Sequence, residues 1–463
     1  MLSRYTSPEV AEIFTEESRL EAWRRVEVAA AWAGAEEGRW PSRLATLVAE
    51  APTPTPSQVA EVEATTRHEV VAFLLAWTAD MAEEAKPIVH RGLTSSDVVD
   101  TGLSLQLVAA SRLIMRQLDQ LCVVLRDHAL AHRGTLRLGR THGQAATVEV
   151  WGHRVADFAF GIDRCRRRFA DATDEVALVK LSGPTGGYHD LSPTIEQRVA
   201  ATLQLRVPDV STQVLMRDRL AAWIATMGIT ASVCEAVALD VRLGQHHGVA
   251  EVHEASGDAQ AGSSSMPHKR NPITAERVCG LARLVRGTVL PVTEGIALWH
   301  ERDLTHSSVE RVVVPDAVAL TDHVLAATTQ LVANLHVDTT AMRSAVDAAG
   351  GATQTHLAVG ILCDHGIGWP AAWRIVRDIA TDTLLTRDEM VDRLVDAAPR
   401  NGTDWAVAFT GLAGADPGSV GGTDLTPVFE RLAELPDQMP RRGGTDSRPP
   451  QSRRVEDRTL SSP

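Results

Sequence analysis

The chain has 463 residues, of which 44% are hydrophobic and 23% charged, and its formal net charge is −13. These values are typical of a water-soluble protein that is large enough for more than one domain. The negative charge argues against general binding to nucleic acid or to an anionic membrane, although it permits a local basic pocket.

The five cysteines are scattered, and no two of them form a C-x-x-C pair. This usage predicts reduced, buried thiols in a cytoplasmic protein. The first ten residues, MLSRYTSPEV, are polar and lack the apolar segment of a signal peptide. We expect no apolar run of the ~20 residues needed to cross a bilayer, and therefore no membrane contact.

The strongest helical pattern follows residue 94. Apolar residues recur there at spacings of three and four, at Leu103, Leu107, Ala110, Ile114, Leu118, Leu121 and Leu125. Ser95, Ser96 and Asp97 precede this stripe and suit a helix N-cap. Similar periodicity runs through 146–170, 217–249, 276–299 and 311–336. Because strand-like alternation is scarce, we predict an all-α protein with a central bundle of long helices.

Changes in composition divide the chain. We predict an N-terminal helical domain over 1–93, the long-helix bundle over 94–350 and a C-terminal helical domain over 351–435. Residues 436–463 are rich in proline and poor in large apolar side chains, which predicts a disordered tail. Two stretches rich in glycine, serine and proline, 180–193 and 255–272, are expected to be loops.

The second loop carries the densest chemistry. From Gly262 to Pro272 it reads GSSSMPHKRNP, which combines hydroxyls, an ammonium group and an amide. Such groups can stabilise an anion and supply a base. From composition alone, the same stretch also fits a simple linker ahead of a helix.

This string closely resembles the signature loop of the fumarase/aspartase superfamily, G-S-S-x-M-P-x-K-x-N. Thr141–Gln144 resembles its T-H-G-Q segment, and Thr94–Asp97 resembles its T-S-x-D segment. The three segments follow the superfamily's order, and the resemblance covers about 1–435. It implies a homotetramer whose four bundles merge into one core, with each active site drawing on three subunits and requiring no cofactor or metal.

Four further segments resemble the adenylosuccinate lyase family, in which they hold the nucleotide. They are Arg4-Tyr5, Thr66–Phe73, Ser211–Gln213 with Arg217–Arg219, and Trp299–Asp303 with Ser307–Arg311. The resemblance assigns substrate binding to Arg4, Tyr5, Arg67, Glu69, Thr94, Ser95, Thr141, Gln213, Arg302, Ser307 and Arg311. Arginine suits this role because its paired donors match phosphate and carboxylate oxygens.

The chemistry implied by the resemblance is an anti β-elimination. It needs a base for the succinyl carbon, a clamp for the developing carboxylate charge and an acid for the leaving nitrogen. The resemblance makes Ser263 the base, Lys269 and Asn271 the clamp and His142 the acid. It places His68 as a second histidine near the substrate.

The expected reaction is cleavage of adenylosuccinate to AMP and fumarate, together with cleavage of the succinyl-carboxamide intermediate of purine synthesis. One alternative is a lyase for another succinyl-amine, because position 69 is Glu where the family usually has Asp. A second is an inactive structural relative, against which the intact catalytic set argues. A metal site at His246, His247, His253 and Glu254 is the weakest reading, since their spacing is loose.

Overall fold

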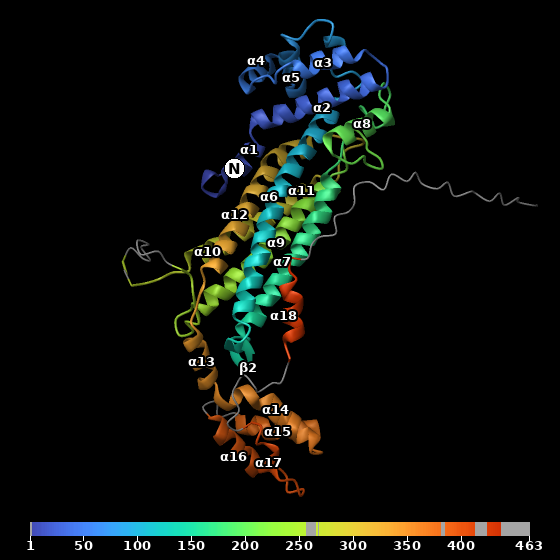
Figure 1. Cartoon of the computed structure of the whole chain (residues 1–463). Helices are drawn as coiled ribbons and strands as arrows, with labels where there is room; N and C mark the ends of the chain where they lie inside the picture. The colour runs from blue at the N-terminus through green and yellow to red at the C-terminus, as the bar shows by residue number, and fades with distance from the viewer. Residues whose placement is uncertain (1, 256–264, 267, 381–384, 413–423, 437–463) are drawn as a thin grey trace, which may run out of the picture.

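The computed structural model describes residues 2–255, 265–266, 268–380, 385–412 and 424–436. The protein is elongated, with a bundle of long helices between a helical region at each end (Figure 1). Ser263 and the predicted tail beyond residue 436 lie outside the described residues. The domain limits stay a prediction.

The bundle is built from five long helices that share one apolar core. They are α6 (Ser95–Ala131), α7 (Trp151–Val176), α9 (Asp218–Gly244), α10 (Ile273–Gly287) and α12 (Thr305–Ala333), with the short α11 (Val289–Glu294) after α10. The stripe predicted from Leu103 to Leu125 lies in this core, in which Leu103 is partly buried and the others are buried. The prediction of a long-helix bundle is thus confirmed, because each helix has an apolar face that only its neighbours can cover.

Shorter helices occupy the ends. Around the N-terminus lie the 3₁₀ helix Ser3–Tyr5, α1 (Pro8–Ile13), α2 (Glu16–Glu36), α3 (Ser42–Glu50), α4 (Pro56–Thr66), α5 (Glu69–Thr78), the 3₁₀ helix Lys86–Ile88 and α8 (Pro193–Leu203). The far end holds α13 (Thr339–Ala348), the 3₁₀ helix Gly350–Gln354, α14 (Thr355–Asp364), α15 (Trp369–Ala380), α16 (Arg387–Ala397) and α17 (Trp405–Ala408). The last described helix, α18 (Thr426–Ala433), returns to pack on α6 and α7.

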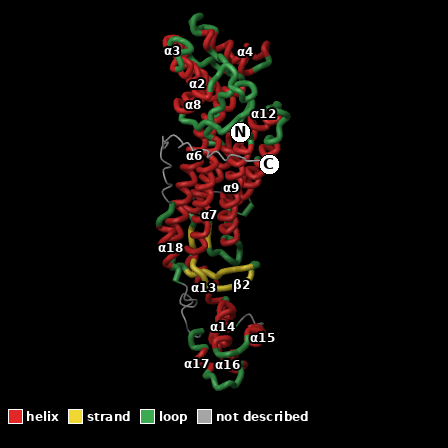
Figure 2. The backbone as a smooth tube through the Cα atoms, turned by 90° about the vertical axis from the view of Figure 1, so that its right-hand side faces the viewer, coloured by secondary structure: helices red, strands yellow, loops and turns green. Residues whose placement is uncertain are grey.

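The prediction of an all-α protein needs one correction. Two short antiparallel pairs join β1 (Leu136–Thr141) to β2 (Gln144–Val150) and β3 (Val252–His253) to β4 (His336–Val337). Figure 2 shows them at the end of the bundle that is away from α2 and α3. The helix predicted from 146 therefore begins only at Trp151. A two-residue turn with left-handed backbone, at His142 and Gly143, closes the first pair and favours a hairpin there.

A second correction concerns hydropathy. By length and composition alone, α6, α9 and α12 are apolar enough to cross a membrane, with mean hydropathies of 1.3, 1.5 and 1.2. About half of each apolar window is buried inside the chain. These helices are apolar because one side of each forms the bundle core. On α9, the opposite side also carries apolar residues, and these are exposed.

The cysteines match the prediction of reduced thiols. All five are free, four are buried and Cys363 is half-buried. Burial raises the pKa of Cys122 and of Cys234 to about 12, so these thiols are protonated and unreactive at neutral pH.

A buried ion pair fastens the start of α6. The Lys180 ammonium lies 2.7 Å from Oδ1 of Asp97, and neither side chain is exposed. Asp97 also accepts hydrogen bonds from the backbone of Thr94, Ser182 and Gly183. Burial raises the pKa of Asp97, and Lys180 opposes that rise. Asp97 therefore caps α6 and ties it to the loop after α7, and Thr94 rather than Ser95 is the N-cap.

Lys180→Met tests this pair, because it leaves a buried carboxylate without a cation. We expect the free energy of unfolding to fall by about 3–5 kcal/mol, measured as a lower thermal midpoint. Lys86→Met is the matched control, since Lys86 pairs with Glu83 at the surface and such pairs contribute little. Equal midpoints for the two variants would contradict a structural role for Lys180.

Candidate active site

The predicted substrate-binding residues gather mainly at the end of the bundle that carries the N-terminal helices. We call this set the upper group. It comprises Arg67, His68, Glu69, Thr94, Ser95, Gln213, Arg302, Ser307 and Arg311. Most of them lie in or beside the first turns of α5, α6 and α12, where backbone N–H groups lack helical partners and favour anions.

A cavity of about 180 Å³ opens between α2, α5, α6 and α12. Its apolar wall includes Trp23, Leu103 and Val314, and its polar side includes Arg19, Glu69, Ser307, Glu310 and Arg311. Glu69 accepts hydrogen bonds from both Arg19 and Arg311. Burial opposes its ionisation, but these two guanidinium groups hold the pKa of Glu69 below its ordinary value. The cavity thus combines an apolar surface with charged anion-binding groups.

Beneath this cavity a buried arginine joins three helices. Arg217 donates to Asp100 on α6 at 2.7 and 2.8 Å, and its Nε donates to Glu310 on α12 at 2.9 Å. Burial opposes the charge of Arg217, but its two carboxylate partners raise its pKa. Arg217 therefore holds α6, α9 and α12 together. The nucleotide-binding role inferred for its segment stays a prediction.

His306 lies beside this network, in the first turn of α12. It is buried, and its Nδ1 has no hydrogen-bond partner among the described residues. Burial, together with the positive charge of the nearby Arg217, lowers the pKa of His306 to about 4. His306 is therefore neutral at physiological pH and adds no charge to the cavity.

The loop predicted over 180–193 packs against the Ser211–Gln213 segment. The hydroxyls of Ser182 and Ser211 lie 2.6 Å apart, and Thr212 donates to the carbonyl of Glu301 at 2.9 Å. Gly186 has a φ of +85°, and an added Cβ would approach the Ser211 carbonyl oxygen to 2.1 Å. Only glycine allows this contact. The hydrogen bond from Thr212 to Glu301 brings the segment of Gln213 beside the segment that carries Arg302.

Three residues predicted to be catalytic, His142, Lys269 and Asn271, lie elsewhere, together with Thr141, which was predicted to bind substrate. The predicted catalytic His68 lies in the upper group. We call Thr141, His142, Lys269 and Asn271 the lower group. His142 is exposed at the tip of the β1–β2 hairpin, and its φ of +54° is uncommon for a residue with a side chain. Arg140 anchors the hairpin by donating to Glu251 at 2.6 and 3.1 Å.

The described part of the signature loop is fastened where it enters α10. Glu254 accepts from the backbone N–H of Thr274 at 2.8 Å and also from Ala275, and so caps α10. Gln245 donates to the carbonyl of Arg270 at 3.2 Å and accepts from the backbone N–H of Glu254. These contacts fix the path of the segment with Lys269 and Asn271, which leads into α10.

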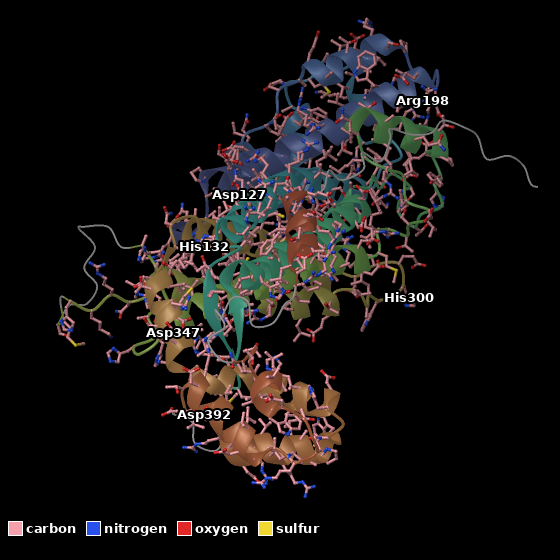
Figure 3. All side chains as sticks on the ribbon, turned by 60° about the horizontal axis from the view of Figure 1, so that its bottom comes forward. Asp127, His132, Arg198, His300, Asp347 and Asp392 are labelled. Atoms are coloured by element: carbon pink, nitrogen blue, oxygen red, sulfur yellow. The ribbon has the colours of Figure 1, made fainter. Side chains whose placement is uncertain are left out.

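One chain does not bring the upper and lower groups together. Thr94 precedes α6, and the hairpin that carries His142 follows its end. A helix of 37 residues is about 55 Å long. In Figure 3, His132 near the hairpin and His300 near Arg302 lie on opposite sides of the bundle.

The two N-terminal residues predicted to bind substrate lie apart from the cavity. The ring of Tyr5 packs against His323 on α12, with ring centroids 5.1 Å apart. His323 is twelve residues after Arg311, which corresponds to about 18 Å along the helix. Within one chain, Tyr5 and the adjacent residue Arg4 are therefore not beside Ser307 and Arg311.

Sequence reasoning missed several of these groups. Arg19 follows no motif. Gln245 lies 25 residues before its partner Arg270, and Glu254 lies 20 residues before Thr274. The imidazole of His90, whose φ is +55°, lies 2.6 Å from the buried Glu27 carboxylate. Glu254 was considered as a metal ligand, but it caps α10, and the described residues contain no cluster of three or more potential ligands.

The chain is similar to known proteins in both sequence and structure. A family model described as lyase matches residues 4–287. The adenylosuccinate lyase of Synechocystis sp. is 39% identical over 86% of this chain and 92% of its own length. That of Bacillus subtilis is 37% identical over 82% of this chain and 88% of its own length.

The solved structures support the same fold. Fumarate lyase from Mesorhizobium sp. superposes with a TM-score of 0.81 at 22% identity, covering 93% of this chain and 99% of that one. A 3-carboxy-cis,cis-muconate lactonizing enzyme from Pseudomonas putida gives 0.78 at 25% identity, covering 93% and 96%.

Proposed function

The chain belongs to the lyase family of the fumarase/aspartase superfamily, and from this premise we propose that it cleaves adenylosuccinate to AMP and fumarate. The observation that carries the proposal is the cavity beside Ser307 and Arg311. In a protein with a net charge of −13, these groups form a local site for a phosphate next to an apolar surface that suits a purine. The succinyl-carboxamide intermediate of purine synthesis carries the same phosphate and succinyl groups, so we include it as a substrate.

In the proposed mechanism, Ser263 as its alkoxide removes a proton from the succinyl carbon. The electron pair enters the adjacent carboxylate, where Lys269 and Asn271 stabilise the added negative charge. Collapse of this intermediate forms the fumarate double bond and breaks the C–N bond. His142 then gives a proton to the departing nitrogen, and His68 assists near the same atoms. The exposed position of His142 in the turn between β1 and β2 supports this role, because a proton donor must be accessible to the ligand.

We further propose that each active site is shared between subunits of a homotetramer. The length of α6, about 55 Å, supports this because it separates Thr94 at one end from the His142 hairpin beyond the other end. Another copy could supply the residues that one chain keeps apart. The exposed side of α9 supplies a surface for assembly. Its residues Ala222, Ala225, Ile229, Ser232, Ala236, Leu239 and Leu243 recur at spacings of three and four, as in a coiled-coil seam. Leu239 and Leu243 are 45% and 58% exposed.

One observation favours a second candidate, a lyase that releases fumarate from a different succinyl-amine. Glu69 fills the position at which the adenylosuccinate lyase family usually has Asp, and its carboxylate extends into the cavity. The added methylene changes the space left for a ligand.

Fumarate release from adenylosuccinate and from its dephosphorylated nucleoside separates the two candidates. We expect a higher kcat/KM for the nucleotide. The difference should correspond to about 3–6 kcal/mol of transition-state stabilisation, since two charge-assisted contacts contribute about 1.5–3 kcal/mol each. A panel of other succinyl-amines is the control. Equal rates for nucleotide and nucleoside would favour the second candidate.

Ser263→Ala tests the base. Loss of a general base lowers turnover by roughly 10²–10⁴-fold, so we expect a fall of that size in kcat with little change in substrate binding. Ser265→Ala, at the variable position of the motif, is the matched control and retains most activity. A nearly normal kcat for Ser263→Ala would refute the assignment.

Hybrid tetramers test the shared site. His142→Ala and Ser263→Ala proteins are each expected to be inactive. After they are mixed, dissociated and reassembled, some sites contain neither substitution, and fumarate release returns in part. Leu239→Glu, which places a charge in the α9 seam, is expected to yield inactive monomers by light scattering. Mixed tetramers without any activity, or active monomers, would contradict the shared site.

A further inference from the structure

The cavity beside α12 already contains an anion that belongs to the protein. Glu69 is the first residue of α5, and its two carboxylate oxygens bind different arginines. Oε2 accepts from Nη1 of Arg19 at 2.8 Å, and Oε1 accepts from Nη2 of Arg311. The carboxylate therefore occupies Arg311, to which the proposed function assigns the phosphate of the substrate.

The two arginines are held very differently. Arg19 also donates to Glu16 through Nε and Nη2, at 3.1 and 2.5 Å, and its guanidinium lies 4.6 Å from the Trp23 ring centre. Its side chain is 24% exposed, whereas that of Arg311 is 53% exposed. Arg19 is thus fixed by several contacts, while Arg311 can turn toward a ligand once it leaves Glu69.

We propose that Glu69 is an internal counter-anion, which neutralises Arg311 in the empty site and stays with Arg19 when a phosphate takes Arg311. The inference rests on the proposed function for the position of the phosphate. A bound phosphate carries close to two negative charges and three acceptor oxygens, and so competes well with one carboxylate. A ligand without a phosphate has no group that displaces Glu69.

This exchange makes Glu69 a determinant of specificity. It weakens every ligand that must displace it, because the Glu69–Arg311 contact is lost on binding. The cost is offset only where a strong anion replaces the carboxylate. The site then stays neutral when empty, which avoids two unpaired cations in a partly buried cavity.

Four variants of the full-length protein test the exchange, with AMP as the probe and adenosine as the probe that lacks a phosphate. Glu69→Gln removes the competing charge, so the Kd of AMP should fall about three- to tenfold, the range for one partly exposed charge pair. Arg19→Met removes the arginine that keeps Glu69 when a phosphate binds. Glu69 then pairs with Arg311 alone, which should raise the Kd of AMP by a similar factor. In the double variant Glu69→Gln/Arg19→Met, AMP should bind as tightly as in Glu69→Gln alone, because Arg19 acts only through Glu69. Glu17→Gln, at an exposed site on α2, the helix that also carries Arg19, controls for net charge and should leave the Kd of AMP unchanged.

Calorimetric titration of each variant decides the inference. Weaker AMP binding in Glu69→Gln than in the unmodified protein would overturn it and make Glu69 a positioning group for Arg311. A double variant much weaker than Glu69→Gln would also overturn it, since Arg19 would then contact the phosphate. The adenosine Kd should respond far less than the AMP Kd in every variant, and an equal response would overturn the inference as well.

Failure of the proposed function is recognised separately. If the unmodified protein released no fumarate from adenylosuccinate, the proposed activity would be wrong, while the expected order of AMP affinities would still support the exchange at Glu69. Normal fumarate release with the same AMP affinity in all variants would leave the activity intact and reject the exchange.

Discussion

The length of α6 governs how this protein can assemble an active site. A 37-residue helix is about 55 Å long, and its two ends carry different parts of the chemistry. Thr94 and Ser95 open the helix beside the arginine-lined cavity, and the hairpin with His142 follows its end. A rigid rod of this length cannot bend far enough to join them. This separation supports the proposal that a second copy completes the site, and the exposed apolar side of α9 offers such a copy a surface to pack on.

Buried charges hold the upper end of the bundle in shape. Lys180 and Asp97 join the loop after α7 to α6, and Arg217 joins Asp100 to Glu310 across three helices. Buried ion pairs of this kind add little net stability compared with apolar packing, but breaking them is costly. They fix the helix starts whose first turns form the cavity wall. In the proposed function, Arg311 receives the phosphate of the substrate, and Glu69, which also binds Arg19, neutralises Arg311 while the site is empty.

Particular residues show where sequence reasoning reached its limit. The stripe from Leu107 to Leu125 was read correctly, because a period of 3.6 is a local property of the chain. The hairpin at 136–150 was missed: its alternation is short, and the turn depends on His142 adopting a left-handed backbone. Arg217 sits in a segment that suggested ligand binding, yet Asp100, 117 residues earlier, makes it structural. No local pattern reveals a partner at that separation.

The sequence by itself determined the family and the helical bundle, because motifs and periodicity lie in neighbouring residues. Only the tertiary structure decided which of those residues meet. It separated His142 from Thr94 by the length of a helix, placed Arg19 opposite Arg311 across Glu69 and turned the outer face of α9 to the surface. These relations depend on the path of the whole chain through space, which no segment encodes alone.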